Sequence, residues 1–260
     1  MAGQSRHPFL VDVLVRRFPQ HDRQRLRGYI ACGNVMVDGA RITDEKACVP
    51  ASAEIALEFP RYVSRGGYKL EKALDAFSLS VSGLVMLDAG ASTGGFTDCL
   101  LQHGAACVHS VDVGYNQLDW KLRTDSRVIV HEKQNIMTVE VLEPPADAAV
   151  CDLSFRSIAG AASHILSLTK MGWLVALVKP QFETPKNMPG FTGVVREETV
   201  LRDVMAHVHD ILEADGVGVR NIVRSPLEGL KGGNTEFLVL LVQGKGMDKD
   251  AMLSSAFVSD

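Results

Sequence analysis

Short apolar runs alternate with helical patterns along most of this chain, and this alternation constrains the fold more than any other feature of the sequence. From about residue 64 onward, runs of strand length are separated by segments with helical spacing. The pattern is typical of an α/β domain in which a doubly wound, mostly parallel, Rossmann-like sheet carries helices on both faces. The predicted strands cover 84–87, 108–113, 128–130, 148–153, 173–178, 217–223 and 237–242, and the predicted helices cover 96–103, 117–123, 158–170 and 199–214.

The first 60 residues follow a different pattern, typical of a small α+β module. Gly33 would end the second of two helices, and Asp38-Gly39 is a favoured hairpin turn. The predicted elements are helices over 9–18 and 23–32, a hairpin over 35–42 and a strand over 54–59. We therefore expect a module over 1–60, a linker and first helix over 61–83, the main domain over 84–246 and a tail over 247–260.

Charge is divided unevenly between these parts. The whole chain has 27 Lys and Arg against 31 Asp and Glu, a net charge of −4 that by itself argues against a nucleic-acid partner. Residues 1–70, however, hold 11 basic and 7 acidic residues, so they carry +4 and the remainder carries −8. Either the basic excess is a solvated helix face, or it is an RNA-binding surface, which the helix and hairpin pattern favours. The arginines concerned are Arg16, Arg17, Arg23, Arg25 and Arg27.

Composition and spacing exclude several other classes of protein. With 46% hydrophobic and 22% charged residues, the chain has a globular balance. Its longest apolar runs are far shorter than the ~20 residues that span a bilayer, and the first residues lack the apolar core of a signal peptide, so we expect a cytoplasmic protein. The five cysteines form no CxxC pair and the histidines are scattered, so we expect reduced thiols and no metal site.

A glycine loop follows the first strand of the main domain, where an α/β sheet binds its ligands. Residues 88–98 read Asp-Ala-Gly-Ala-Ser-Thr-Gly-Gly-Phe-Thr-Asp, and the glycines let backbone approach a ligand closely. The spacing is not the Gly-x-Gly-x-x-Gly of pyrophosphate sites, and Asp88 suits an ammonium group better than a phosphate. Both features favour S-adenosylmethionine. Asp112, after the next strand, is placed to bind ribose hydroxyls, whereas Asn135 either contacts the cofactor edge or lies at the surface.

An acid and a lysine follow the next two strands. Asp152 ends one strand, and Lys179 ends the strongly apolar run 173–178. A lysine in that position is costly unless it is paired or functional, so the two side chains form either a simple salt bridge or part of a site.

Jointly, these motifs resemble the TlyA-like ribosomal RNA 2′-O-methyltransferases, also called haemolysin A, which join an alpha-L RNA-binding module to an FtsJ/RrmJ-type methyltransferase domain. The matching segments are 63–70, 88–98, 111–115, 151–155, 178–183 and 232–237. The resemblance implies S-adenosyl-L-methionine as cofactor and ribosomal RNA or ribosomal particles as partner. It also implies a catalytic tetrad of Lys69, Asp152, Lys179 and Glu236.

In that tetrad, Lys179 would activate the ribose hydroxyl and Asp152 would orient Lys179. Lys69 and Glu236 would hold the ribose and tune the lysine pair. Repulsion between two lysines favours the neutral amine that can accept a proton, and the two acids oppose this. The Pro- and Gly-broken segment 183–193 departs from the family pattern and suggests a substrate loop. Arg65 joins the predicted RNA-binding residues, and the predicted cofactor-binding residues are Asp88, Gly90, Ser92, Gly94, Gly95, Phe96, Asp112, Asn135 and Asp152.

Three rival functions stay open at this point. A dinucleotide-dependent oxidoreductase is disfavoured by the glycine spacing. A non-catalytic RNA-binding factor would keep the basic module without the chemistry. A pore-forming haemolysin has no support from any apolar amphipathic stretch.

Overall fold

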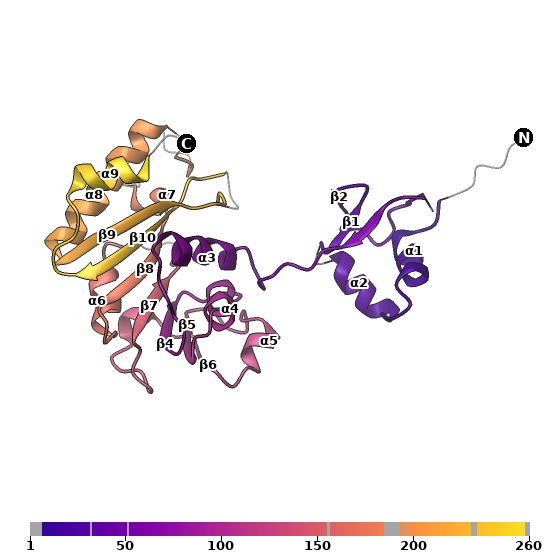
Figure 1. Cartoon of the computed structure of the whole chain (residues 1–260), viewed down its shortest axis with the longest axis horizontal. Helices are drawn as coiled ribbons and strands as arrows, with labels where there is room; N and C mark the ends of the chain where they lie inside the picture. The colour runs from indigo at the N-terminus through magenta and orange to yellow at the C-terminus, as the bar shows by residue number, and fades with distance from the viewer. Residues whose placement is uncertain are drawn as a thin grey trace, which may run out of the picture. The chain divides into compact units, whose positions relative to one another are not determined.

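The chain divides after Arg61 into two units (Figure 1). Each unit has its own apolar core. The structure is a computed structural model. It describes residues 7–31, 33–50, 52–154, 157–184, 193–195, 197–229 and 233–257. In this described part, no helix is long and apolar enough to cross a membrane.

The first unit packs two helices on a small antiparallel sheet. The strands lie in the order β2-β1-β3, and both central residues of the β1–β2 turn, Asp38 and Gly39, have positive φ as a tight hairpin turn requires. Leu14, Leu26 and Ile30 are fully buried between the helices and the sheet. The elements are α1 (Leu10–Arg17), α2 (Arg23–Ala31), β1 (Val35–Val37), β2 (Ala40–Arg41) and β3 (Ile55–Leu57).

The second unit is built on a seven-stranded sheet in the order β6-β5-β4-β7-β8-β10-β9. The first five strands in this order are parallel, and β10 runs antiparallel to both β8 and β9. The sheet therefore confirms the expected mostly parallel α/β architecture. The strands are β4 (Val85–Ala89), β5 (Cys107–Asp112), β6 (Val128–Glu132), β7 (Ala148–Cys151), β8 (Trp173–Val178), β9 (Val217–Arg224) and β10 (Phe237–Gln243).

Helices cover both faces of this sheet, as two separate clusters of buried side chains show. One cluster joins the sheet to α3, α4 and α5, and the other joins it to α6, α8 and α9. Alternate residues of β4 point into opposite clusters, Met86 into the first and Leu87 into the second. The helices are α3 (Gly66–Ala76), α4 (Gly95–Gln102), α5 (Trp120–Arg123), the 3₁₀ turn η1 (Ile136–Thr138), α6 (Ala162–Ser167), α7 (Pro180–Glu183), α8 (Glu198–Ala214) and α9 (Lys249–Ala256).

Three helical segments differ from the prediction. The range 117–123 is helical only from Trp120, because the Asp119 side chain caps α5 by accepting the backbone N–H of Lys121. The range 158–170 holds only the six residues of α6. The expected tail over 247–260 contains α9, whose Met252 and Ala256 are buried against the sheet's second cluster.

Candidate active site

Four ionisable side chains meet at the carboxyl edge of the parallel strands. Asp152 follows β7 and Lys179 follows β8, and these two strands are parallel neighbours. Because β10 is antiparallel to β8, its first residue lies opposite the last residue of β8, and this brings the preceding Glu236 to the same edge. Lys69 reaches this edge from α3. The structure thus brings all four residues of the predicted tetrad together.

The four side chains form two lysine–carboxylate pairs. Lys179 Nζ lies 2.5 Å from Asp152 Oδ1 and 3.4 Å from Ser154 Oγ. Lys69 Nζ donates a hydrogen bond to Glu236 Oε2, and these side chains are only 11% and 4% exposed. A charge so deeply buried needs its partner, because burial without one costs several kcal/mol. The pairing therefore fixes where each amine lies.

Both pairs line one cavity of about 810 Å³, which is within the range of roughly 300–1,000 Å³ common for ligand sites. Its other walls are the loop between β4 and α4, the start of α3, and residues 228–229. The cavity thus joins the predicted glycine loop and the predicted tetrad in one site.

The glycines of that loop are required by close packing. Gly90 has a φ of +88°, and a Cβ there would lie 2.5 Å from the carbonyl oxygen of Asp152. A Cβ at Gly95 would lie 2.2 Å from Ser64 Oγ, next to the start of α3. Since neither position has room for a side chain, the loop presents bare backbone to the cavity.

Comparison with known proteins assigns this arrangement to a family. Residues 62–243 match the family model described as FtsJ-like methyltransferase, which covers most of the chain. The chain belongs to the FtsJ-like methyltransferase family.

Individual relatives extend the likeness beyond that segment. The 16S/23S rRNA (cytidine-2′-O)-methyltransferase TlyA of Mycobacterium tuberculosis is 40% identical over 239 residues, which are 88% of each chain. YqxC of Bacillus subtilis, a provisionally named rRNA methyltransferase, is 44% identical over 185 residues, or 70% of this chain and 66% of that protein. A solved structure of a provisionally named haemolysin from Streptococcus thermophilus has 35% identity and a TM-score of 0.74, and it covers 96% of this chain and 94% of its own.

FtsJ-like methyltransferases use S-adenosyl-L-methionine, and the residues around the glycine loop fit this cofactor. Gly90 lines the main cavity as bare backbone, because the Asp152 carbonyl leaves no room for a Cβ, and Ser92 lines both that cavity and a smaller pocket that contains Asp112. Asp112 is held in place because its carboxylate accepts the backbone N–H groups of Ser92, at 2.8 Å, and Gly114, at 2.6 Å. Among the described residues, no group of three or more His, Cys, Asp or Glu side chains is arranged to hold a metal ion.

Three predicted cofactor contacts of this FtsJ-like protein, Asp88, Gly94 and Asn135, lie away from the walls of the main cavity and of the smaller pocket. A Cβ at Gly94 would lie 2.2 Å from the Leu122 side chain, so this glycine faces α5. Asp88 is 0% exposed, and its Oδ2 accepts a hydrogen bond of 2.6 Å from Thr97 Oγ1, which ties β4 to α4. Burial raises the pKa of the Asp88 carboxyl to about 7, although the Thr97 hydrogen bond opposes this shift. Asn135 accepts the backbone N–H of Met137 at 3.0 Å and so caps η1.

The predicted RNA-binding arginines of the first unit are all exposed, and most have partners within that unit. Arg23 pairs with Asp12 and Arg27 pairs with Glu45, each through contacts below 3 Å. Arg25 Nε donates to the Tyr29 hydroxyl at 2.6 Å. In the second unit, Arg65 is exposed and lines the main cavity.

Sequence reasoning assigned no role to several residues that line the cavity, among them Ser154, Gln181 and Asn234. Asn234 is buried, and its side-chain amide accepts from Val195 N at 2.9 Å and donates to Gly193 O at 3.1 Å. This holds residues 193–195 beside the site. Asn234 belongs to the motif 232–237, so the signal was present in the sequence. Most of the predicted substrate loop 183–193 lies outside the described residues.

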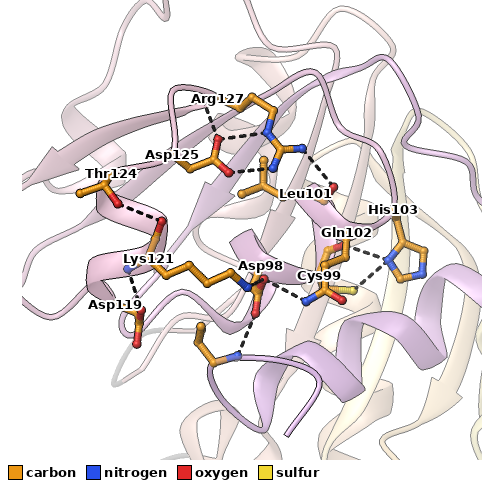
Figure 2. A network of polar contacts seen from close by, with 11 residues as sticks. Asp98, Cys99, Leu101, Gln102, His103, Asp119, Lys121, Thr124, Asp125 and Arg127 are labelled. Atoms are coloured by element: carbon orange, nitrogen blue, oxygen red, sulfur yellow. Dashed lines mark hydrogen bonds and ion pairs between the residues drawn. The ribbon is translucent and has the colours of Figure 1, made fainter. Parts of the chain in front are cut away.

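Another residue to which sequence reasoning assigned no role, Asp98, fixes the segment that leads into α3 (Figure 2). Its buried carboxylate accepts the backbone N–H of Val63 at 2.8 Å, the Gln102 amide at 3.0 Å and the Lys121 amine at 3.2 Å. Asp98 therefore joins the segment before α3 to α4 and α5. Because α3 carries Lys69, this network positions one member of the tetrad from a distance.

Proposed function

We propose that this protein transfers a methyl group from S-adenosyl-L-methionine to the 2′-oxygen of a ribose in ribosomal RNA. The observation that carries the proposal is the pair of lysine–carboxylate contacts on the wall of a cavity that the glycine loop also lines. The likeness to TlyA, an rRNA (cytidine-2′-O)-methyltransferase, over 88% of the chain supports the same reaction and substrate. The reaction then takes place where ribosomal RNA is found, in the cytoplasm.

In this proposal, Lys179 accepts the proton of the ribose hydroxyl. The bound cofactor supplies a methyl group attached to a positively charged sulfur. The ribose oxygen attacks this methyl group more readily when a neighbouring base accepts the proton of the hydroxyl. An ammonium group has three donors and no acceptor, so Lys179 acts in its neutral form. Asp152, 2.5 Å away, holds the amine in one position, so that the hydroxyl meets it in a fixed geometry.

Lys69 and Glu236 hold the ribose in this proposal. Lys69 donates one of its hydrogens to Glu236, which leaves its other donors for oxygen atoms of the substrate. Because both side chains are almost fully buried and Glu236 directly precedes β10, the pair is held in one place at the edge of the sheet. A fixed donor of this kind contributes to the rate by orienting the substrate.

The decisive test is transfer of a radiolabelled methyl group from the cofactor to ribosomal RNA, with the modified sites mapped as 2′-O-methyl groups. Naked rRNA and isolated ribosomal subunits are both offered as substrates. We expect transfer by the wild type, and no transfer by Lys179→Ala or by Lys179→Arg, since arginine keeps the charge but cannot accept a proton. Lys170→Ala is the matched control, because Lys170 precedes β8 whereas Lys179 follows it.

The outcome separates the proposal from its rivals. If the wild type binds the cofactor and RNA but transfers no methyl group, the protein is a binding factor and the proposal is wrong. If Lys179→Arg keeps full activity, the reaction stands but Lys179 is not the proton acceptor. Cofactor affinity, measured by calorimetry with S-adenosylhomocysteine, should be nearly the same in all four proteins.

The exposed arginines of the first unit are proposed to bind RNA phosphates. Arg16 and Arg25 are suited to a test, because among the described residues neither forms an ion pair with an acid. Replacing both by Gln should weaken RNA binding and lower the slope of log K against log salt by about 1.4, since each lost phosphate contact removes about 0.7 on single-stranded RNA. An unchanged slope in a filter-binding titration would mean that this face is only solvated.

A further inference from the structure

A second cavity, of about 530 Å³, opens beside the catalytic one, and nothing in the proposed reaction uses it. One wall is formed by a face of α3 together with the residue that precedes the helix, and it contains Arg65, Tyr68 and Lys72. The other wall contains Pro226 and Leu227. We call it the α3 groove. The spacing of three and then four residues places the three α3-side residues on one helix face.

The α3 groove continues the catalytic cavity, because the two share both walls. Arg65 lines both of them. On the α3 side, Lys69 faces the catalytic cavity, while its neighbour Tyr68 lines the groove. On the other side, residues 226 and 227 line the groove and the next two residues of the chain, 228 and 229, line the catalytic cavity. The groove therefore offers an extended ligand seated at the tetrad a path out of the catalytic cavity.

A contact between the walls fixes this passage. Arg65 Nη2 donates to the backbone carbonyl of Glu228 at 3.0 Å, so the guanidinium is anchored across the junction of the two cavities. The ring of Tyr68 is held edge-on against the buried Tyr62, with their centroids 5.1 Å apart. A preformed wall of this kind needs little ordering when a ligand binds.

The chemistry of the groove suits a nucleotide. An aromatic ring with a leucine and a proline opposite can take a base on its flat faces, and such stacking is the usual way in which proteins hold unpaired bases of RNA. Arg65 supplies a cation at the end nearest the tetrad. Lys72 is exposed and, among the described residues, has no hydrogen-bond or ion-pair partner, so its charge is available to a phosphate. The acids Glu71 and Asp75, also in the groove wall, keep its net charge near zero and suit base amino groups better than a second phosphate.

We infer that the α3 groove binds the nucleotide next to the methylated one in the RNA strand, with its base against Tyr68 and Leu227 and a phosphate at Arg65 and Lys72. The inference rests on the proposed function, because it takes the ribose at the tetrad to belong to RNA. It makes the groove a determinant of which sequence is methylated, separate from the tetrad that performs the transfer.

The test combines two substitutions with a crosslink. Lys72→Glu and Leu227→Ala change opposite walls of the groove, and Lys245→Glu is the matched control, an exposed lysine at the far end of β10 from Glu236. Each protein is assayed on the ribosomal RNA or subunit that the wild type methylates. We expect each groove variant to raise KM by about tenfold, within the range of one lost stacking or phosphate contact, with kcat changed less. Affinity for S-adenosylhomocysteine should equal that of the wild type, since neither residue lines the cofactor pockets.

In the second arm, benzoylphenylalanine at position 227 is crosslinked to the same substrate by light. A crosslink to a nucleotide adjoining the mapped 2′-O-methyl site supports the inference. A crosslink only to ribosomal protein, or groove variants that match the wild type within twofold, overturns it and leaves the proposed function intact. A wild type that transfers no methyl group to any ribosomal RNA overturns both.

Discussion

The buried carboxyl of Asp88 makes the stability of the second unit depend on pH in a predictable direction. With a pKa of about 7 in the folded state against an ordinary value of 3.8 for an exposed aspartate, this group holds its proton more tightly when folded. Between those values the folded state binds more protons than the unfolded state, so the stability that Asp88 contributes is present at low pH and is lost as pH rises towards 7. Asp88→Asn removes the titration and keeps an oxygen that can accept from Thr97 Oγ1.

The size of the expected change in stability follows from the interval between the folded and unfolded pKa values of Asp88. Each pH unit between the two pKa values changes the free energy of unfolding by about 1.4 kcal/mol. From pH 5 to pH 8, the stability of Asp88→Asn relative to the wild type should therefore rise by about 2–3 kcal/mol, most of it below pH 7. Titrating groups that do not interact with Asp88 are common to both proteins and cancel in the difference.

Tryptophan fluorescence during urea unfolding provides the assay, because both tryptophans of the chain, Trp120 and Trp173, lie in the second unit. Trp173 is almost fully buried, so its emission reports loss of that core. Curves are measured at half-unit steps of pH for both proteins. If the difference in stability between the two proteins changes by less than about 1 kcal/mol from pH 5 to pH 8, the reasoning is refuted. Such a result would mean that Asp88 does not titrate in this range of pH.

Three further substitutions test how the site is held. Gly90→Ala should weaken S-adenosylhomocysteine binding at least about tenfold in calorimetry, because left-handed backbone and the Asp152 carbonyl both oppose a Cβ, whereas Gly160→Ala, in open space, should not. Glu236→Gln should lower kcat about a hundredfold with little change in cofactor affinity, and a wild-type kcat would remove Glu236 from the site. Asp98→Ala should lower the stability of the second unit by about 2–4 kcal/mol in urea, since it removes three hydrogen bonds to a buried carboxylate; a change below 0.5 kcal/mol would contradict the network in Figure 2.

The sequence predicted the parts of the site that depend on local pattern. The runs ending before Asp152 and Lys179 are apolar and short, and the ends of parallel strands share an edge, so the proximity of these two residues could be predicted from the sequence alone. The predicted strands 173–178 and 237–242 also agree with the observed bounds of β8 and β10 to within one residue, because fully buried strands are unbroken apolar runs in the sequence. Lys69 and Glu236 came from resemblance alone.

What the sequence could not supply depends on tertiary geometry. Apolar periodicity does not give strand direction, so the antiparallel placement of β10, which brings Glu236 to the site, was not predictable. Nor does it show that Asp88 is buried behind Thr97 while Asp112 lines a pocket, because both acids stand near the carboxyl ends of apolar runs. The hydrophobic residues of 249–256 do not gather on one helix face, so their pattern does not predict α9, although Met252 and Ala256 are enough to dock it.

The contact between Lys69 and Glu236 joins residues 167 positions apart in the chain. During synthesis the first unit, α3 and most of the sheet leave the ribosome before β10 does. A nascent or truncated chain that ends before Glu236 therefore holds an unpaired lysine where the site should be, and it has no complete tetrad. Such a chain can already carry the exposed arginines of its first unit, so RNA binding and catalysis should appear at different moments in the life of the polypeptide, and only the finished protein should methylate.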